Sequence, residues 1–327
     1  KEFSQGHWPG AVNVPLFNND ERADVGKTYK QKGREKAILL GLKITGPKIL
    51  KLKEQIEALT SSRLEVCPQE GKAKPVRIYC WRGGMRSASV GWLLDLCGLK
   101  PLVLTGGYKN YRNWVLNQFK KKWPIRLLAG RTGTGKTDIL LYLEERAFSV
   151  IDLEGLANHR GSSFGGLGQP EQPTSEQFEN LIAEKLEASR RNTNQEVWIE
   201  AESSHLGRCR IPNLLSNQMK EAPLIEITRS KEERVKNLVE TYSKYKKQSL
   251  KDATLRISRR LGPQRTNTAL KAIEEESWKE ACCAMLDYYD RCYDYELKDH
   301  QSRKKLDLTG LTTEMVLKEF SKEGLIN

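Results

Sequence analysis

The sequence of 327 residues lacks several features that mark whole classes of protein. It contains no run of about eighteen apolar residues, so we predict no transmembrane helix and no membrane partner. It has no internal repeat and no low-complexity tract. Its apolar fraction of 38% and its well-mixed charged fraction of 30% exclude a mainly disordered or collagen-like chain.

The cysteines show none of the paired C-x-x-C spacings of a zinc site, so no zinc is expected. Seven cysteines are an odd number and do not suit a disulfide scaffold. Free thiols in a reducing compartment fit best, which predicts a cytoplasmic protein. The sequence starts at Lys1 without a methionine, and organellar targeting upstream of Lys1 stays open.

Positive charge is concentrated in two regions. The formal net charge is +13, and residues 1–122 hold 23 Lys and Arg against 10 Asp and Glu, whereas the remainder is balanced. Within that remainder, residues 229–265 carry 12 basic and 4 acidic side chains. A polyanionic partner, nucleic acid first, is one interpretation, and a soluble surface that happens to be basic is the other.

Strand and helix patterns alternate twice, which predicts an α/β protein with two parallel sheets. Residues 1–120 form the first predicted domain, residues 124–230 the second, and residues 231–327 a helical, partly basic subdomain packed on the second. Residues 120–124 are predicted to be a linker. The glycine-rich stretch 155–173 is predicted to be a long functional loop. Strands are expected at 75–80, 101–104, 125–129, 148–153, 197–201 and 224–228.

Cys80 is the candidate nucleophile. It ends a predicted strand, a glycine pair follows, and Arg86 stands six residues later just before a helix. The backbone N–H groups of such a loop can surround an anion with help from Arg82 and Arg86, and the same field favours the reactive thiolate. A buried core cysteine is the alternative.

This loop resembles the active-site loop of rhodanese-like domains. Residues 3–15 and 104–108 are similar to two further rhodanese signatures, and the usual first strand would precede Lys1. The C-x5-R length also occurs in dual-specificity phosphatases, which normally carry His before the Cys. Tyr79 takes that place here and weakens the phosphatase interpretation.

A second motif, G-x-x-x-x-G-K-T, spans residues 130–137 between a predicted strand and a helix. In this setting the motif indicates a phosphate-binding loop for a di- or triphosphate. Backbone N–H groups approach the phosphates, Lys136 supplies a positive charge and Thr137 can hold Mg²⁺. The phosphate-binding candidates are Gly130, Thr132, Gly133, Thr134, Gly135, Lys136 and Thr137.

An acidic residue that serves the loop as Mg²⁺ ligand or acid/base should follow a neighbouring strand, and the sequence does not choose among four. These candidates are Asp152, Glu154, Glu200 and Glu202. Other polar residues are candidates for substrate or RNA contacts, with solvated surface charge or structural packing as the alternative. They are His159, Arg160, Ser162, Ser163, Arg259, Arg260, Gln264 and Arg265.

Together the two loops and several other stretches resemble one family, the tRNA 2-selenouridine synthases. The matching stretches are residues 80–87, 152–165, 200–203, 261–265, 288–290 and 293–295. The resemblance runs from Phe3 to about Leu297 and implies a transferase acting on the wobble uridine of tRNAs for Lys, Glu and Gln.

The resemblance also implies two cosubstrates. Geranyl diphosphate first alkylates the sulfur of 2-thiouridine, and selenophosphate then replaces the S-geranyl group with selenium. An enzyme that produces selenophosphate is an implied partner. For Cys80 the resemblance implies a role in the selenium step, either carrying selenium covalently or positioning selenophosphate.

Two other functions stay open from the sequence. A rhodanese-type sulfurtransferase or Cys-loop phosphatase coupled to a nucleotide-binding switch would turn over ATP or GTP without tRNA. A non-enzymatic remnant would bind tRNA without forming a product.

Overall fold

The computed structural model describes residues 1–64, 75–191, 196–298, 300 and 302–326, with only the backbone of 61–64. Cys67 lies outside these residues. The chain divides into two compact units, Lys1–Trp114 and Val115–Asn327. In the described residues, no helix combines the length and the apolar character that crossing a membrane requires.

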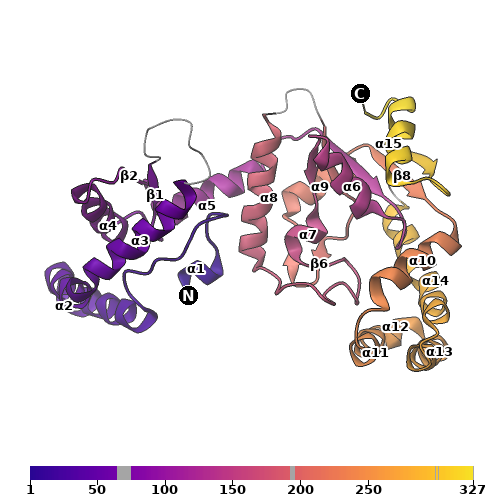
Figure 1. Cartoon of the computed structure of the whole chain (residues 1–327), viewed down its shortest axis with the longest axis horizontal. Coiled ribbons are helices and arrows are strands. Elements are labelled where there is room, and N and C mark those ends of the chain that lie inside the picture. Colours follow the sequence, from indigo (N-terminus) through magenta and orange to yellow (C-terminus); the bar gives the residue numbers. More distant parts are fainter. Residues whose placement is uncertain (65–74, 192–195, 299, 301, 327) are drawn as a thin grey trace. The chain divides into compact units, whose positions relative to one another are not determined.

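The first unit contains one small parallel sheet (Figure 1). Its strands pair in parallel, with Ile78 opposite Val103. Leu52, Ile56 and Leu94 pack beside this sheet as the core of the unit. The elements are α1 (Glu2–Gln5), α2 (Asn19–Thr45), η1 (Gly46–Lys48), α3 (Ile49–Leu64), β1 (Val76–Ile78), α4 (Met85–Leu96), β2 (Pro101–Val103) and α5 (Gly107–Gln118), and the boundary between the units falls within α5.

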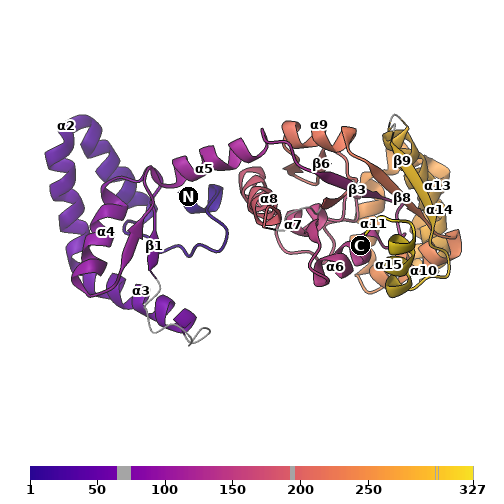
Figure 2. The ribbon, with the colours of Figure 1, turned by 90° about the horizontal axis from the view of Figure 1, so that it is seen from above.

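The second unit is built on a five-stranded parallel sheet in the order β4-β5-β3-β8-β9. Figure 2 shows β3, β8 and β9 of this sheet side by side. The expected strands are all present: those at 125–129 and 224–228 have the predicted bounds, and the other four are shorter. The strands are β3 (Ile125–Ala129), β4 (Ser149–Ile151), β5 (Val197–Glu200), β8 (Leu224–Thr228) and β9 (Arg303–Asp307), and β6 (His205–Leu206) and β7 (Cys209–Arg210) form a separate antiparallel pair.

Helices surround the sheet and extend from it. Trp198 of β5 stacks on Phe320, and both belong to a buried cluster that includes Leu140. Helices 11 to 14 gather into a helical part, where α13 and α14 pack closely (Figure 1). The helices are α6 (Lys136–Glu145), α7 (Leu153–Ala157), α8 (Ser175–Ser189), α9 (Asn213–Glu221), α10 (Lys231–Tyr242), α11 (Lys247–Arg256), α12 (Ser258–Leu261), α13 (Pro263–Glu274), α14 (Trp278–Leu297) and α15 (Thr313–Lys322).

Three local predictions need correction. Residues 231–327 are not helical throughout, because β9 joins the sheet beside β8. Four of the five residues of β9 are charged and only Leu306 is buried, so the sequence lacks the alternation of apolar and polar residues that predicts a strand. This segment is a strand because it pairs with β8. Residues 120–124 are not a free linker, since Trp123 is buried and its backbone N–H donates to Gln218.

The third correction concerns the predicted loop 155–173, whose start is the short helix α7. The Asp152 side chain caps this helix by accepting a hydrogen bond from the Gly155 backbone N–H at 2.8 Å. Asn158 ends the helix in the left-handed conformation with φ 51°. A helix of five residues is too short to show an apolar periodicity, so the sequence pattern did not predict it.

Candidate functional site

Cys80 lies just after β1, in the loop that leads to α4. Gly83 (φ 62°) and Gly107 (φ 58°) let this loop pack against the turn before α5. A Cβ on Gly107 would lie 2.2 Å from the Cys80 carbonyl oxygen, so only glycine fits. Backbone hydrogen bonds from Tyr108 to Cys80 and from Lys109 to Trp81 close the contact.

The N-terminal segment reaches the same place. The Trp8 backbone N–H donates to the Tyr79 hydroxyl at 3.0 Å, and the Trp8 ring stacks on Tyr111. The three stretches singled out as rhodanese signatures therefore meet around the Cys80 loop. Cys80 and Ser87 line a cleft that residues of the N-terminal segment also line.

Cys80 is half-buried, and its hydrogen bonds favour the thiolate. Burial of the thiol acts to raise its pKa, but hydrogen bonds from the Ser87 hydroxyl and from the backbone N–H groups of Ser87, Arg82 and Gly84 outweigh it. The pKa of Cys80 is lowered as a result, and the Ser87 hydroxyl lies 3.3 Å from its sulfur. A lowered thiol pKa is the physical basis of a nucleophilic cysteine.

The two arginines of the loop differ in their placement. Arg86 pairs with both carboxylate oxygens of Glu2, at 2.7 and 3.4 Å, and lines the cleft beside Cys80. An anion there would share Arg86 with Glu2. Arg82 contributes its backbone N–H to Cys80, a role the sequence analysis did not foresee.

The phosphate loop connects the end of β3 to the start of α6. Gly133 (φ 85°) and Gly135 (φ 82°) adopt left-handed backbone conformations. The ammonium group of Lys136 reaches back across the loop to the Gly130 carbonyl oxygen at 2.9 Å. Thr134 closes the loop by donating to the Arg131 carbonyl oxygen at 2.8 Å. The N-terminus of α6, which is the positive end of the helix dipole, begins at this loop and can attract a phosphate group.

Three carboxylates meet beside this loop. One oxygen of each of Glu154, Glu200 and Glu202 lies within 4.8 Å of the others. Glu154 follows β4, Glu200 is the last residue of β5 and Glu202 follows it. The carboxyl ends of these strands share an edge of the sheet with that of β3. Thr137 of α6 donates to Glu154 at 3.4 Å, which links the cluster to the phosphate loop. Asp152, the fourth candidate, caps α7 instead.

Burial raises the pKa of all three carboxyl groups. Burial raises the pKa of Glu154 against the opposing effect of Lys136, and burial with the neighbouring carboxylates raises that of Glu200 well above its usual range. Burial also raises the pKa of Glu202 to about 8. One oxygen of Glu200 is buried and, among the described residues, has no hydrogen-bond partner. This all-oxygen donor set beside Thr137 fits a hard divalent cation such as Mg²⁺.

The segment after α7 passes over the carboxylates. A Cβ on Gly161 would lie 2.8 Å from an oxygen of Glu202. Burial lowers the pKa of His159, and the nearby charge of Arg256 adds to this effect. Arg160 contacts the Tyr245 hydroxyl at 3.5 Å, Ser162 accepts from the Phe164 backbone N–H, and Ser163 donates to the Ala253 carbonyl. Ser162 therefore shapes this segment locally, and Ser163 ties it to α11.

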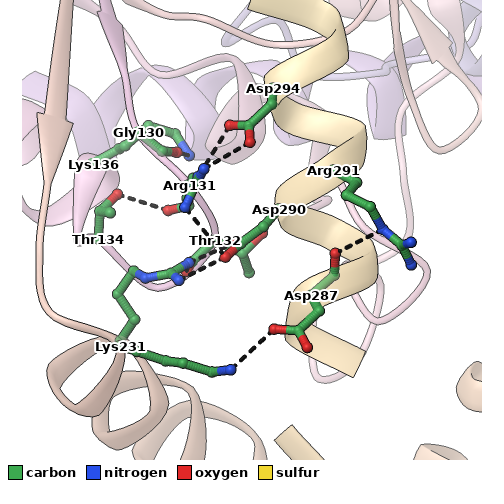
Figure 3. Close-up of polar contacts among 11 residues, drawn as sticks. Gly130, Arg131, Thr132, Thr134, Lys136, Lys231, Asp287, Asp290, Arg291 and Asp294 are labelled. Carbon is green, nitrogen blue, oxygen red and sulfur yellow. Dashed lines mark hydrogen bonds and ion pairs between the residues drawn. The ribbon is translucent and has the colours of Figure 1, made fainter. Parts of the chain in front are cut away.

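Helix α14 holds the phosphate loop through carboxylates that the sequence analysis did not assign a role (Figure 3). Arg131 donates to both oxygens of Asp294, at 3.0 and 2.6 Å, and lies 3.6 Å from Asp290. Lys136 also lies 6.0 Å from the ring centre of Tyr293. The i, i+4 spacing of Asp290 and Asp294 could have indicated this contact from the sequence, because it places both carboxylates on one face of the helix.

Much of the basic charge predicted at 229–265 is paired within the fold. Five of its side chains form ion pairs with carboxylates: Arg229, Lys231, Arg234, Lys247 and Lys251. Arg259, Arg260 and Gln264 are exposed, and Arg265 is partly so. Arg260 interacts with Tyr288 and Arg265 with Asp287, both on α14. These two arginines therefore contact α14 and not the cluster of Glu154, Glu200 and Glu202.

Comparison with known proteins assigns both halves of the chain. A rhodanese-like domain model matches residues 1–113, and the model of the tRNA 2-selenouridine synthase AAA domain matches residues 123–320. This chain belongs to the tRNA 2-selenouridine synthase family. The arrangement of a rhodanese-like unit and a phosphate-loop unit with a helical part is thus confirmed.

Several curated members of the tRNA 2-selenouridine synthase family are similar along most of the chain. The synthase of Marinobacter nauticus is 35% identical and covers 92% of this chain and 87% of its own. The synthase of Sulfurovum sp. is 32% identical over 98% of this chain and 92% of its own. A crystal structure of the N-terminal domain of a putative ATP/GTP binding protein from Clostridium difficile 630 is 37% identical, covers 35% of this chain and 81% of its own, and has a TM-score of 0.30.

Proposed function

We propose that this protein is a transferase that replaces the sulfur of 2-thiouridine in tRNA with selenium, using geranyl diphosphate and then selenophosphate. The expected acceptors are the wobble uridines of tRNAs for Lys, Glu and Gln. The observation that supports a two-step reaction is the presence of two chemically different sites in one chain. Cys80 is an activated thiol, and the loop at 130–137 is built to hold phosphates beside three carboxylates.

In the first step we place the diphosphate on the phosphate loop. The thiouridine sulfur forms a bond to C1 of the geranyl chain, the C1–O bond breaks, and diphosphate leaves with that electron pair. The loop N–H groups and Lys136 stabilise the charge that develops on the leaving group. The proton on N3 of the base must also depart, and the ionised members of the carboxylate cluster are candidate acceptors.

The carboxylate cluster and Thr137 are the residues that would hold Mg²⁺ here. A bound cation would neutralise charge on the diphosphate. Without one, the raised pKa values of Glu200 and Glu202 let protons relieve the repulsion within the cluster. The same residues therefore serve the loop as metal ligands or as acids and bases.

In the second step C2 of the S-geranylated base is the electrophile. A thiocarbonyl is a poor leaving group, whereas the carbon of an S-alkyl isothiourea is attacked readily, which explains why alkylation comes first. The selenium of selenophosphate forms a bond to C2, and the C2–S bond breaks as geranyl thiolate leaves and takes up a proton. Water then attacks phosphorus, the P–Se bond breaks, and phosphate leaves 2-selenouridine in the tRNA. Cys80 and Arg86 position selenophosphate in the cleft that both side chains line.

Nucleoside mass spectrometry of 2-thiouridine tRNA incubated with the protein and both cosubstrates tests the proposal. The expected products are S-geranyl-2-thiouridine and then 2-selenouridine. We expect Lys136→Ala to abolish both products, and Cys80→Ser to accumulate the S-geranyl intermediate. Lys185→Ala and Cys97→Ser are the matched controls, because Lys185 forms a surface ion pair and Cys97 is exposed.

Two outcomes would contradict the proposal. No product from folded protein, together with ATP or GTP hydrolysis in the absence of tRNA, would favour a sulfurtransferase coupled to a nucleotide switch. Loss of both products in Cys80→Ser would refute the division of labour between the two sites.

A further inference from the structure

An apolar pocket opens beside the phosphate loop in the second unit. Thr132 of the loop forms part of its wall, and Ser162 and Phe164 form another part. The rest comes from α10, α11, α13 and α14, and includes Val239, Cys282 and Met285. The exposed lining is almost entirely carbon, and the cavity volume is about 70 Å³.

The pocket and the phosphate loop share their supports, so they keep a fixed relation. On α10, Arg234 donates to the Thr132 carbonyl at 3.2 Å and Asn237 donates to the Gly133 carbonyl at 2.9 Å. The next residues of this helix, Leu238 and Val239, line the pocket. One turn and a half of helix thus carries both the loop contacts and the apolar wall.

Helix α14 repeats this arrangement. Asp290 binds Arg234 and lies near Arg131, while Cys282, Met285 and Leu286 of the same helix line the pocket. The segment that passes over Glu202 at Gly161 continues directly to Ser162 and Phe164 in the pocket wall. Helices α10 and α14 and the segment at 161–164 therefore connect the phosphate loop and its carboxylates to the apolar pocket.

We propose that this pocket binds the hydrocarbon tail of the diphosphate ester and selects its length. The inference rests on the proposed function, because it assumes that the phosphate loop holds the diphosphate. A ligand placed here has a charged end at Lys136 and an apolar end among these side chains. A nucleoside base would leave its hydrogen-bonding groups unpaired against such a lining, whereas an isoprenoid chain would lose only water.

A matched pair of substitutions on α14 tests the pocket. Cys282→Phe fills the pocket, whereas Cys283→Phe adds the same ring at an exposed neighbour. The ligands are inorganic diphosphate, dimethylallyl diphosphate and geranyl diphosphate, titrated by calorimetry with the full chain. We expect the wild type to bind geranyl diphosphate at least tenfold more tightly than the dimethylallyl ester, since each buried methylene adds to affinity.

We expect Cys282→Phe to remove most of that preference and to leave the affinity for inorganic diphosphate within twofold. Cys283→Phe should match the wild type with all three ligands. Should Cys282→Phe fail to fold, Val239→Phe fills the pocket from α10 and predicts the same result. Trp278 lines the pocket too, so a fluorescence change that geranyl diphosphate causes should disappear in Trp278→Phe.

The possible results separate the two proposals. Equal affinities of the wild type for inorganic and geranyl diphosphate would overturn the pocket inference alone, and so would a geranyl preference that survives Cys282→Phe and Val239→Phe. Absence of binding for every diphosphate would overturn the proposed function together with the pocket. Tight binding of ATP that Cys282→Phe abolishes would assign the pocket to a nucleotide and also refute the inference.

Discussion

Arg234 of α10 and Asp290 of α14 form a buried ion pair with two parallel hydrogen bonds, each 2.7 Å long. Their side chains are only 5% and 14% exposed. Arg234 also donates to the Thr132 carbonyl of the phosphate loop. The pair therefore joins the helical part of the second unit to the loop at 130–137.

We predict that Asp290→Asn destabilises the protein by about 3 kcal/mol, because it leaves the Arg234 guanidinium buried without a countercharge. Urea unfolding followed by circular dichroism measures the change. Asp287→Asn is the control on the same helix. Its pair with Lys231 is exposed and should contribute well below 1 kcal/mol, and an equal loss in both variants would contradict the prediction.

Removal of the Ser87 hydroxyl should make Cys80 less reactive. Ser87→Ala deletes the side-chain hydrogen bond that stabilises the thiolate, so the pKa of Cys80 rises and less thiolate is present at pH 7. Iodoacetamide labelling, read at the Cys80 peptide by mass spectrometry across pH, should show a several-fold slower reaction and a profile moved to higher pH. Ser89→Ala, on the exposed side of α4, should leave the profile unchanged.

Stability should fall as pH rises through the range set by Glu202. An unperturbed glutamate loses its proton near pH 4.5, whereas burial keeps Glu202 protonated in the folded protein to about 8. Between these values the folded state binds more protons, so the free energy of unfolding decreases with pH. Thermal unfolding from pH 5 to 8.5 should show a falling melting temperature.

Glu202→Gln should weaken that pH dependence, with Glu200 responsible for a remainder, and Glu171→Gln is an exposed control. Addition of Mg²⁺ at pH 8 should raise the melting temperature of the wild type more than that of Glu202→Gln. Identical pH profiles for the wild type and Glu202→Gln would show that Glu202 ionises normally.

Arg259 and Arg260 are exposed and are the strongest candidates in the helical part for contact with the tRNA backbone. Each phosphate contact adds about 0.9 to the slope of log affinity against log salt for double-stranded nucleic acid. The double variant Arg259→Ala/Arg260→Ala should therefore bind tRNA more weakly and with a shallower slope in a filter-binding assay. Lys247→Ala, whose charge is already paired with Glu276, should bind as the wild type does.

Local signals in the sequence predicted six of the strands, the two glycine loops and the family. Residues 130–137 predict the phosphate loop because each residue type has a backbone or charge requirement that is readable in order. The Cys80 loop is likewise contiguous, so Cys80 could be named as the candidate nucleophile without a structure. Short-range patterns of this kind do not depend on partners elsewhere in the chain.

Only the tertiary structure decided which distant groups meet. It selected Glu154, Glu200 and Glu202 from four acidic candidates, because strand order brings the ends of β4 and β5 together and Asp152 is used as a helix cap. It placed Arg86 on Glu2, and it added β9 to the sheet. The apolar pocket also arises only in three dimensions, since its walls come from helices that look like ordinary amphipathic helices in the sequence.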